Sequence, residues 1–166
     1  MNFTIRIVKP TETALLETAW KWHELAPKWF RDSYDAEDET KEDFLQNAGE
    51  PLLIGVFQDS AMTALLRFSE VAPDVCNIDL FAHRETDGEM LTTACFSVQK
   101  YLFDKGVKGL YGWTVKQNRF VVNLYKKLGF RHDGIKRFRG KIKNRPCEWL
   151  YFENFLTSNA NTVKIT

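Results

Sequence analysis

The sequence is poor in cysteine and lacks the short motifs that identify several large enzyme classes. Its 166 residues include three cysteines, which are far apart and never in C-x-x-C spacing. This odd, scattered set argues against a disulfide framework, so we expect a reducing, cytoplasmic location. No G-x-S-x-G, Walker A or dinucleotide-binding G-x-G-x-x-G motif occurs, which argues against nucleophile-elbow hydrolases, P-loop NTPases and Rossmann enzymes. The three histidines lack zinc-ligand spacing, so no metal site is predicted.

Long apolar runs and a strong net charge are also absent. No apolar run approaches the roughly 18 residues of a membrane span, and the N-terminal "MNFTIRIVKP" has no signal-peptide core, so no membrane partner is expected. A formal net charge of +1 gives no whole-molecule attraction to nucleic acid. Apolar residues make up 44% and aromatic residues 14%, which suffices for a sizeable core. The length fits one domain, expected over residues 1–156 with a polar tail at 157–166.

The charges are nevertheless unevenly distributed. Residues 31–50 hold eight Asp or Glu against Arg31 and Lys41, and residues 126–145 hold nine Lys or Arg against Asp133. Charge runs of this kind more often face water than form a site. The alternatives are that the acidic run receives a cationic substrate and that the basic run, with Arg137 and Arg139 on one face of a strand, receives nucleic-acid phosphates.

Hydrophobic periodicity alternates between strand and helix along the chain. Strands are expected at 3–8, 52–58, 62–68, 75–83, 109–115, 130–142 and 147–155, and helices at 11–25, 40–47, 89–105 and 118–128. Thr11 is the expected N-cap of the first helix, and Gly106 the C-cap glycine of the third. This order predicts an α/β (α+β) fold, a mixed, mostly antiparallel central sheet of about seven strands flanked by about four helices. Two strand-helix-strand units, 75–115 and 108–139, are expected to place parallel strands side by side.

The stretch "NRFVVNLYKKLGFRHDG", residues 118–134, is the most informative part of the chain. Asn118 is a good helix N-cap, and Gly129 fits the position after the helix where a positive φ is needed. Phe130 should then contact the turn that carries Tyr125. Packing explains every residue of this corner except the choice of tyrosine at 125, where leucine would pack as well.

Residues 115–130, "VKQNRFVVNLYKKLGF", resemble the fourth-helix motif of the GCN5-related N-acetyltransferase (GNAT) superfamily. That motif has an Asn, a small residue three positions on, a Tyr seven positions on, and then Lys-x-Gly-Phe. Asn118, Tyr125 and Gly129 occupy the corresponding places, whereas Val121 replaces the small residue. The order of elements over residues 3–155 is similar to the family as well.

The resemblance implies a site and a co-substrate. An amine would attack the thioester of acetyl-CoA, and Tyr125 would be the general acid, because a phenol with a pKa near 10 suits a leaving thiolate of reference pKa about 8.5. Asn118 would hold the pantetheine arm or order the helix start. The remaining positions implied to contact acetyl-CoA (acyl-CoA) lie on the fourth strand and the turn after it, namely Leu80, Phe81, Ala82, Arg84 and Gly88.

The turn itself departs from the family. The family binds the CoA pyrophosphate with a Q/R-x-x-G-x-G/A turn, but residues 83–94, "HRETDGEMLTTA", contain one glycine. Glu85, Asp87 and Glu89 surround the expected anion site. Each like-charge pair a few ångströms apart would cost on the order of a few kcal/mol at an effective dielectric of about 20. The sequence thus predicts a degenerate pyrophosphate loop that Arg84 only partly offsets.

Three hypotheses follow. The first is an N-acyltransferase whose acceptor is a small-molecule or protein amine, with Asp79 as candidate general base and Glu70 and His83 as weaker ones. The second is a GNAT-like fold without catalysis, used for binding or assembly. The third is a nucleic-acid-binding or nucleic-acid-modifying protein that uses the basic run at 126–145. The oligomeric state stays open, with a dimer among the possibilities.

Overall fold

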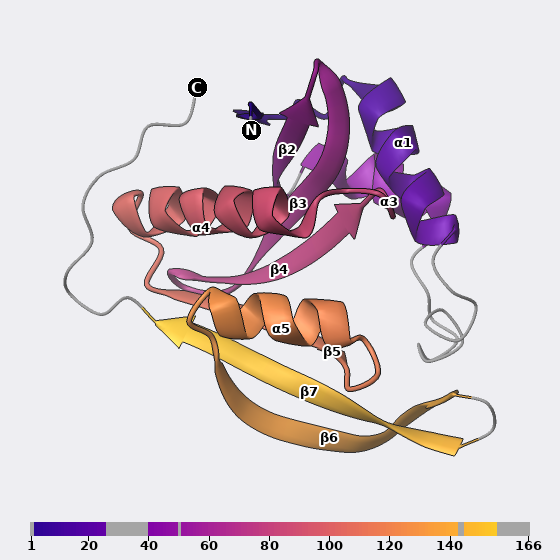
Figure 1. The fold of residues 1–166 in the computed structure, drawn as a ribbon, viewed down its shortest axis with the longest axis vertical. Helices are drawn as coiled ribbons and strands as arrows, with labels where there is room; N and C mark the ends of the chain where they lie inside the picture. Colours follow the sequence, from indigo (N-terminus) through magenta and orange to yellow (C-terminus); the bar gives the residue numbers. More distant parts are fainter. Residues whose placement is uncertain (1, 26–39, 50, 143–144, 156–166) are drawn as a thin grey trace.

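A single sheet of seven strands organises the described part of the chain (Figure 1). The computed structural model describes residues 2–25, 40–49, 51–142 and 145–155, with the backbone alone for 136–142 and 145–149. The strands are β1 Thr4–Ile7, β2 Leu52–Gln58, β3 Ala61–Ala72, β4 Val75–Ala82, β5 Gly109–Val115, β6 Arg131–Ile142 and β7 Arg145–Phe155. Their order is β1-β2-β3-β4-β5-β7-β6, and every neighbouring pair is antiparallel except β4–β5. The predicted mixed, mostly antiparallel sheet is confirmed.

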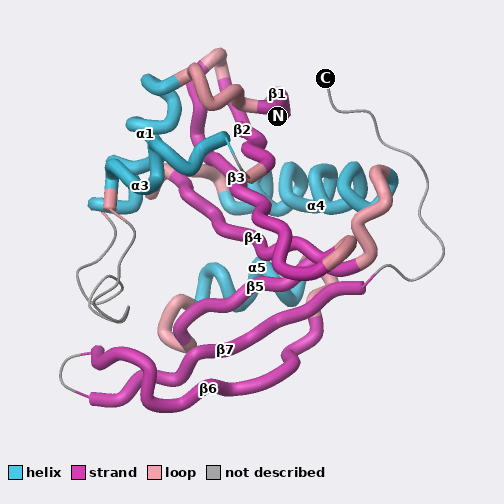
Figure 2. The backbone as a smooth tube through the Cα atoms, turned by 180° about the vertical axis from the view of Figure 1, so that it is seen from behind, coloured by secondary structure: helices cyan, strands magenta, loops and turns pink. Residues whose placement is uncertain are grey.

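Helices cover both faces of this sheet (Figures 1 and 2). They are α1 Thr13–Glu24, α3 Lys41–Gln46, α4 Gly88–Asp104 and α5 Arg119–Lys127, with a short 3-10 helix, η1 Asn47–Gly49, after α3. One apolar core joins α4 and α5 to the sheet and includes Leu91 and Val98, both fully buried. A second core, with Leu16 and Leu65, lies under α1 and α3. Each fully buried leucine contributes roughly 1.5–3 kcal/mol, so both faces hold their helices firmly. None of the helices in the described ranges is long and apolar enough to cross a membrane.

One of the two predicted parallel neighbours is wrong. β4 and β5 do pair in parallel, but β7 lies between β5 and β6. β7 is antiparallel to both strands. Tyr151 of β7 pairs with Trp113 of β5, and the Tyr151 ring lies beside the Tyr111 ring, with 5.8 Å between their centroids. The β6–β7 hairpin thus joins the sheet through its second strand, because an antiparallel partner with aromatic contacts is available there.

The first helix begins two residues later than predicted, and its N-cap lies one residue later. Its N-cap is Glu12 rather than Thr11, and the Glu12 side chain does not cap the helix. The Glu12 carboxylate instead accepts hydrogen bonds from the Arg6 guanidinium and the Lys9 N–H, each at 2.8 Å. The hydrogen bond from Arg6, followed by that from the Lys9 backbone, lowers the pKa of Glu12. These contacts to the preceding strand decide where the helix begins.

The corner around α5 follows the sequence prediction closely. The Asn118 side-chain oxygen accepts from the Val121 N–H at 3.3 Å. At the other end Gly129 has φ +81°, the Phe130 N–H donates to the Tyr125 carbonyl at 2.9 Å, and the Gly129 N–H donates to the Lys126 carbonyl at 3.1 Å. This pair of bonds is a Schellman motif, which satisfies carbonyls that the helix end leaves unpaired. It fixes the direction in which α5 leads into β6.

Candidate functional site

The two parallel strands β4 and β5 separate after a short paired stretch. Only three residue pairs join them, beginning with Val75 and Gly109 and ending with Asn77 and Tyr111. β4 continues to Ala82 and stays paired with β3, so its other edge is without a strand partner there within the described ranges. An unpaired strand edge presents N–H and C=O groups to any chain that lies alongside. The separation therefore forms an opening in the sheet with hydrogen-bonding groups on one side.

Tyr125 lies at the beginning of this opening. Its side chain is 4% exposed and belongs to the core under α4 and α5. The ring packs against Phe130 and Phe152, with centroid separations of 4.9 and 5.0 Å. Its hydroxyl reaches the backbone of Gly112, the first residue of β5 beyond the last β4–β5 pair. Packing on three sides holds the phenol in one place.

Gly112 makes this position possible. A Cβ built on it would lie 2.5 Å from Tyr125 Cζ and 2.8 Å from Cε1, and closer still to the hydroxyl oxygen. A glycine within a strand often marks such a close approach. The sequence does carry a signal for Gly112 that was not used. It is a glycine inside the apolar strand "GLYGWTV".

Asp79 lies on the opposite face of the sheet from Tyr125. Its Oδ2 accepts from Arg67 Nε at 3.0 Å and lies 3.0 Å from Arg67 Nη2, and its Oδ1 accepts from Asn77 Nδ2 at 3.2 Å. The Arg67 guanidinium also lies over the rings of Phe44 and Phe81, 5.5 and 5.4 Å from their centroids. Both carboxylate oxygens therefore have partners within the sheet. Arg67, the one charged residue in "MTALLRF" at 62–68, was a second missed signal.

The other two base candidates are no better placed. His83 Nδ1 accepts the Glu85 N–H at 3.3 Å. The His83 ring lies edge-on to the Trp22 ring, with 6.2 Å between their centroids. Glu70 is exposed and opposite Cys76, at the end where β4 and β5 are still paired. The roles of all three candidates as a general base stay predictions.

The turn between β4 and α4 is tied down by its own side chains. The Asp87 carboxylate accepts the Met90 N–H at 2.7 Å and caps α4. The Thr86 hydroxyl donates to the Thr63 carbonyl at 2.9 Å and so tethers the turn to β3. Arg84 is exposed and only 3.7 Å from Glu85. One helix-terminal N–H that an anion could use is therefore already taken by a carboxylate.

The other predicted contact positions flank the opening. Leu80 and Ala82 face the core under α4, whereas Phe81 is buried on the α1 and α3 face. Gly88 begins α4, and a Cβ there would be 3.6 Å from the Phe120 ring at the start of α5. Asn118 is held as a helix cap. The fold thus gathers the predicted residues around the β4–β5 separation, while their roles stay predictions.

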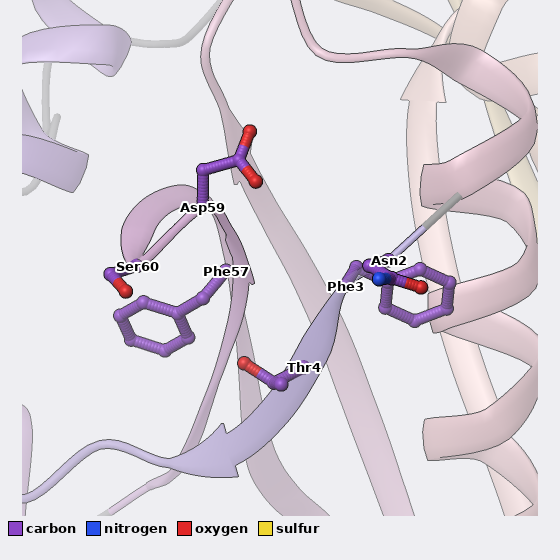
Figure 3. A pocket seen from close by; sticks show the side chains of 6 residues that line it. All are labelled: Asn2, Phe3, Thr4, Phe57, Asp59 and Ser60. Carbon is purple, nitrogen blue, oxygen red and sulfur yellow. The ribbon is translucent and has the colours of Figure 1, made fainter.

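Other features of the described residues offer no rival site. No group of three or more His, Cys, Asp and Glu within those ranges could hold a metal ion. A depression of about 480 Å³ lies at the β1 edge, far along the sheet from β5 (Figure 3). It is lined by Asn2, Phe3, Thr4, Phe57, Asp59 and Ser60, none of which belongs to the predicted site.

Most charged side chains of the acidic run at 31–50 and of the basic run at 126–145 lie outside the described residues. Of the acidic run at 31–50, residues 31–39 and 50 are outside the described ranges; Asp43 is described, and it caps α3 together with Thr40. In the basic run, side chains 136–145 are outside them, and the exposed Arg131 lies 3.5 Å from Glu153. The tail at 157–166 also lies outside the described ranges.

Solved structures share this architecture over nearly the whole chain. An acetyltransferase of the GNAT family from Streptococcus pneumoniae matches with a TM-score of 0.71 and 13% identity, covering 93% of this chain and 100% of that one. A Salmonella typhimurium protein assigned as an acetyltransferase, with its cofactor acetyl-CoA, matches at 0.77 and 13% over 98% and 99%. A ribosomal L7/L12 alpha-N-protein acetyltransferase in complex with coenzyme A matches at 0.76 and 10% over 96% and 97%. This chain has the GNAT fold.

The sequence itself is far from its structural neighbours. No protein-family model and no curated protein matches it. Identities of 10–13% to the three neighbours show a common fold, and the acetyl-CoA and coenzyme A complexes among them are properties of those proteins. Activity and substrates therefore rest on the chemistry of this chain's own site.

Proposed function

We propose that the protein is an N-acyltransferase that moves an acetyl (acyl) group from acyl-CoA to a primary amine. The observation that carries the proposal is the Tyr125 hydroxyl lying against Gly112, where β4 and β5 separate. In the reaction the amine nitrogen bonds to the thioester carbonyl carbon and the carbon–sulfur bond breaks. The amine loses one proton and the leaving sulfur gains one, so protons balance. Acyl-CoA supplies the activated thioester, and Tyr125 would donate to the departing sulfur, since a phenol is still protonated at neutral pH.

The residues present fit one end of acyl-CoA better than the other. The free edge of β4 from Ile78 to Ala82 suits an amide-containing pantetheine arm, which can pair with strand N–H and C=O groups. The β4–α4 turn suits the diphosphate poorly, because Asp87 occupies the Met90 N–H and Glu85 and Glu89 add negative charge. We infer that binding relies mainly on the pantetheine and thioester part.

The acceptor is best described as a primary amine that reacts in its uncharged form. Asp79 and His83 are already engaged, so the amine would lose its proton to water or arrive deprotonated. A protein α-amine and a small-molecule amine both meet this description. The name of the L7/L12 alpha-N-protein acetyltransferase supports including protein N-termini in the first acceptor screen.

Calorimetry with acetyl-CoA, followed by an acetylation screen against polyamines, aminoglycosides, lysine peptides and N-terminal peptides, tests the proposal. We expect binding in the micromolar range and a turnover that falls by about 100-fold in Tyr125→Phe. Tyr111→Phe is the matched control, because Tyr111 lies on the same strand as Gly112 but packs with Tyr151; its turnover should stay within about twofold. No heat of binding at high micromolar acetyl-CoA would sink the catalytic proposal.

A second candidate is a non-catalytic binding module, which the capped, acidic turn favours. It would keep the fold and lose the donor. The same calorimetry separates the two candidates. A non-catalytic binding module should give no heat of binding with acetyl-CoA, and Tyr125→Phe should then change only the stability of the protein.

A further inference from the structure

Three glycines of the sheet lie where a Cβ would collide with an aromatic ring. Gly55 is overlain by Phe57, Gly109 by Phe155, and Gly112 by Tyr125. No φ in the left-handed region requires glycine at any of these positions. The space that a missing Cβ leaves is therefore the reason for glycine here, rather than backbone conformation.

The contact at Gly112 differs from the other two in origin, and from the contact at Gly109 also in the freedom of the ring. Phe57 and Phe155 are strand residues, and Phe155 is 46% exposed, so its ring can move aside. Tyr125 comes from helix α5, is 4% exposed, and is confined by the rings of Phe130 and Phe152. A Cβ at position 112 would push against a ring that has no other place to go.

We propose that Gly112 is a positioning residue for the acyl-transfer reaction, which lets the Tyr125 hydroxyl rest on the β5 backbone at the point where β4 and β5 separate. This inference rests on the proposed function. The ring alone could be packed by many strand residues, but only glycine admits the Cζ–hydroxyl end to the strand surface. The phenol hydroxyl is thus held against the β5 backbone rather than above the layer of side chains. There it lies near the free edge of β4, along which a thioester would bind.

The geometric half of the inference is tested in the free protein. Tyrosines labelled with ¹³C at Cζ give one signal for each of the five tyrosines, and Tyr125→Phe identifies the one from Tyr125. We expect Gly112→Ala to shift that signal and leave the others nearly in place. Gly109→Ala lies on the same strand as Gly112, introduces a contact of 2.6 Å with the Phe155 ring, and should not shift the Tyr125 signal. An unmoved Tyr125 signal in a folded Gly112→Ala protein would overturn the proposal.

The catalytic half is tested by a double-mutant cycle. We expect Gly112→Ala to lower kcat by roughly tenfold or more, because displacing a catalytic group by about 1 Å can cost about 100-fold. The KM for acetyl-CoA should stay within about twofold, since the thioester contacts are not touched. In the Tyr125→Phe background the same glycine substitution should have no further effect on kcat. Equal losses in both backgrounds would mean that Gly112 acts on packing alone, and would overturn the inference.

Two further variants keep the test decisive if Gly112→Ala folds poorly. Gly112→Ala combined with Tyr125→Leu removes the collision and should recover the wild-type melting temperature to within a few degrees. Phe152 pairs with Gly112 across β5 and β7 and packs against the Tyr125 ring. Phe152→Leu therefore loosens the ring without any collision, and should lower kcat only when Tyr125 is present. If the wild-type protein binds no acetyl-CoA, the proposed function fails at that first step. A protein that acetylates amines but shows additive losses refutes the role of Gly112 alone.

Discussion

Replacing Asp87 by Asn should strengthen acetyl-CoA binding without weakening the fold. The Asp87 carboxylate caps α4 by accepting the Met90 N–H at 2.7 Å. Asn caps helices about as well as Asp, so the free energy of unfolding should change by only a few tenths of a kcal/mol. The substitution does remove one negative charge from the turn where the diphosphate of the donor is expected. It therefore isolates the effect of charge from the effect of the cap.

The size of the gain follows from Coulomb's law. For a separation of about 7 Å and an effective dielectric of about 40 at this exposed turn, one charge pair is worth about 1 kcal/mol. That corresponds to a roughly fivefold lower Kd for acetyl-CoA. The gain should shrink as salt is raised from about 0.01 M to about 0.5 M, because the Debye length then falls from about 30 Å to a few ångströms.

Two matched variants complete the experiment, read by calorimetry and urea unfolding. Asp87→Ala removes charge and cap together, so it should lose about 1 kcal/mol of stability, or roughly 2–4 °C in Tm for a chain of this length. Glu89→Gln removes a first-turn charge that caps nothing, and should improve affinity with little change in stability. If Asp87→Asn leaves the Kd unchanged at low salt, the diphosphate does not lie near this turn, and the reasoning about its acids is wrong.

Three other outcomes follow from the structure. Gly129 has φ +81° and Gly106 φ +99°, so Ala at either should cost about 1–2 kcal/mol in urea unfolding, whereas Gly49→Ala, with open space and no positive φ, should stay within about 0.5 kcal/mol. Burial raises the pKa of the Cys95 thiol to about 12, so little of it is the reactive thiolate at pH 8. Peptide mapping after mild iodoacetamide treatment at that pH should find Cys95 unmodified until the protein is unfolded. Rapid labelling of the native protein would contradict the burial of Cys95. Because Asp79 and His83 are engaged, kcat/KM should rise with pH in step with the pKa of each acceptor amine, and a midpoint that is the same for all acceptors would instead reveal a base in the protein.

Local chemistry explains which parts of the fold could be predicted. The turn from α5 into β6 depends on residues within one helix length of each other. Asn118, Gly129 and Phe130 therefore predict it from the sequence. The capping box of Thr40 and Asp43 is equally local. Position 11 failed as a cap because Glu12 bonds backward to Arg6 in β1, a contact set by how the strand and helix meet. Likewise, β7 lies between β5 and β6 because of long-range pairing, which periodicity does not encode.

In the candidate site, too, the local features could be predicted from the sequence and the long-range contacts could not. Tyr125 was conspicuous as a residue that packing did not demand, but its hydroxyl gains a defined place only through Gly112, which is thirteen positions earlier and on another element. Asp79 read as a polar residue on an apolar strand, and only the three-dimensional pairing reveals Arg67 and Asn77 on its oxygens. A sequence can thus nominate a reactive group, whereas its partners decide whether the group is available.

The two ends of the proposed donor site are held by different kinds of interaction. The end around Tyr125 is built into the apolar core, where a change of one methyl group is felt by several neighbours. The end around Asp87 is an exposed turn in which single substitutions cost about 1 kcal/mol or less. Substitutions at the turn therefore cost less stability than substitutions around Tyr125, and this sequence has "NLYKKLGF" at the buried end and "RETDG" at the exposed end before α4. Binding energy lost at the remote diphosphate would raise KM, and it would lower kcat only to the extent that this energy serves to position the thioester. The acidic turn and the proposed role of Tyr125 would therefore be compatible within one enzyme that binds its donor weakly.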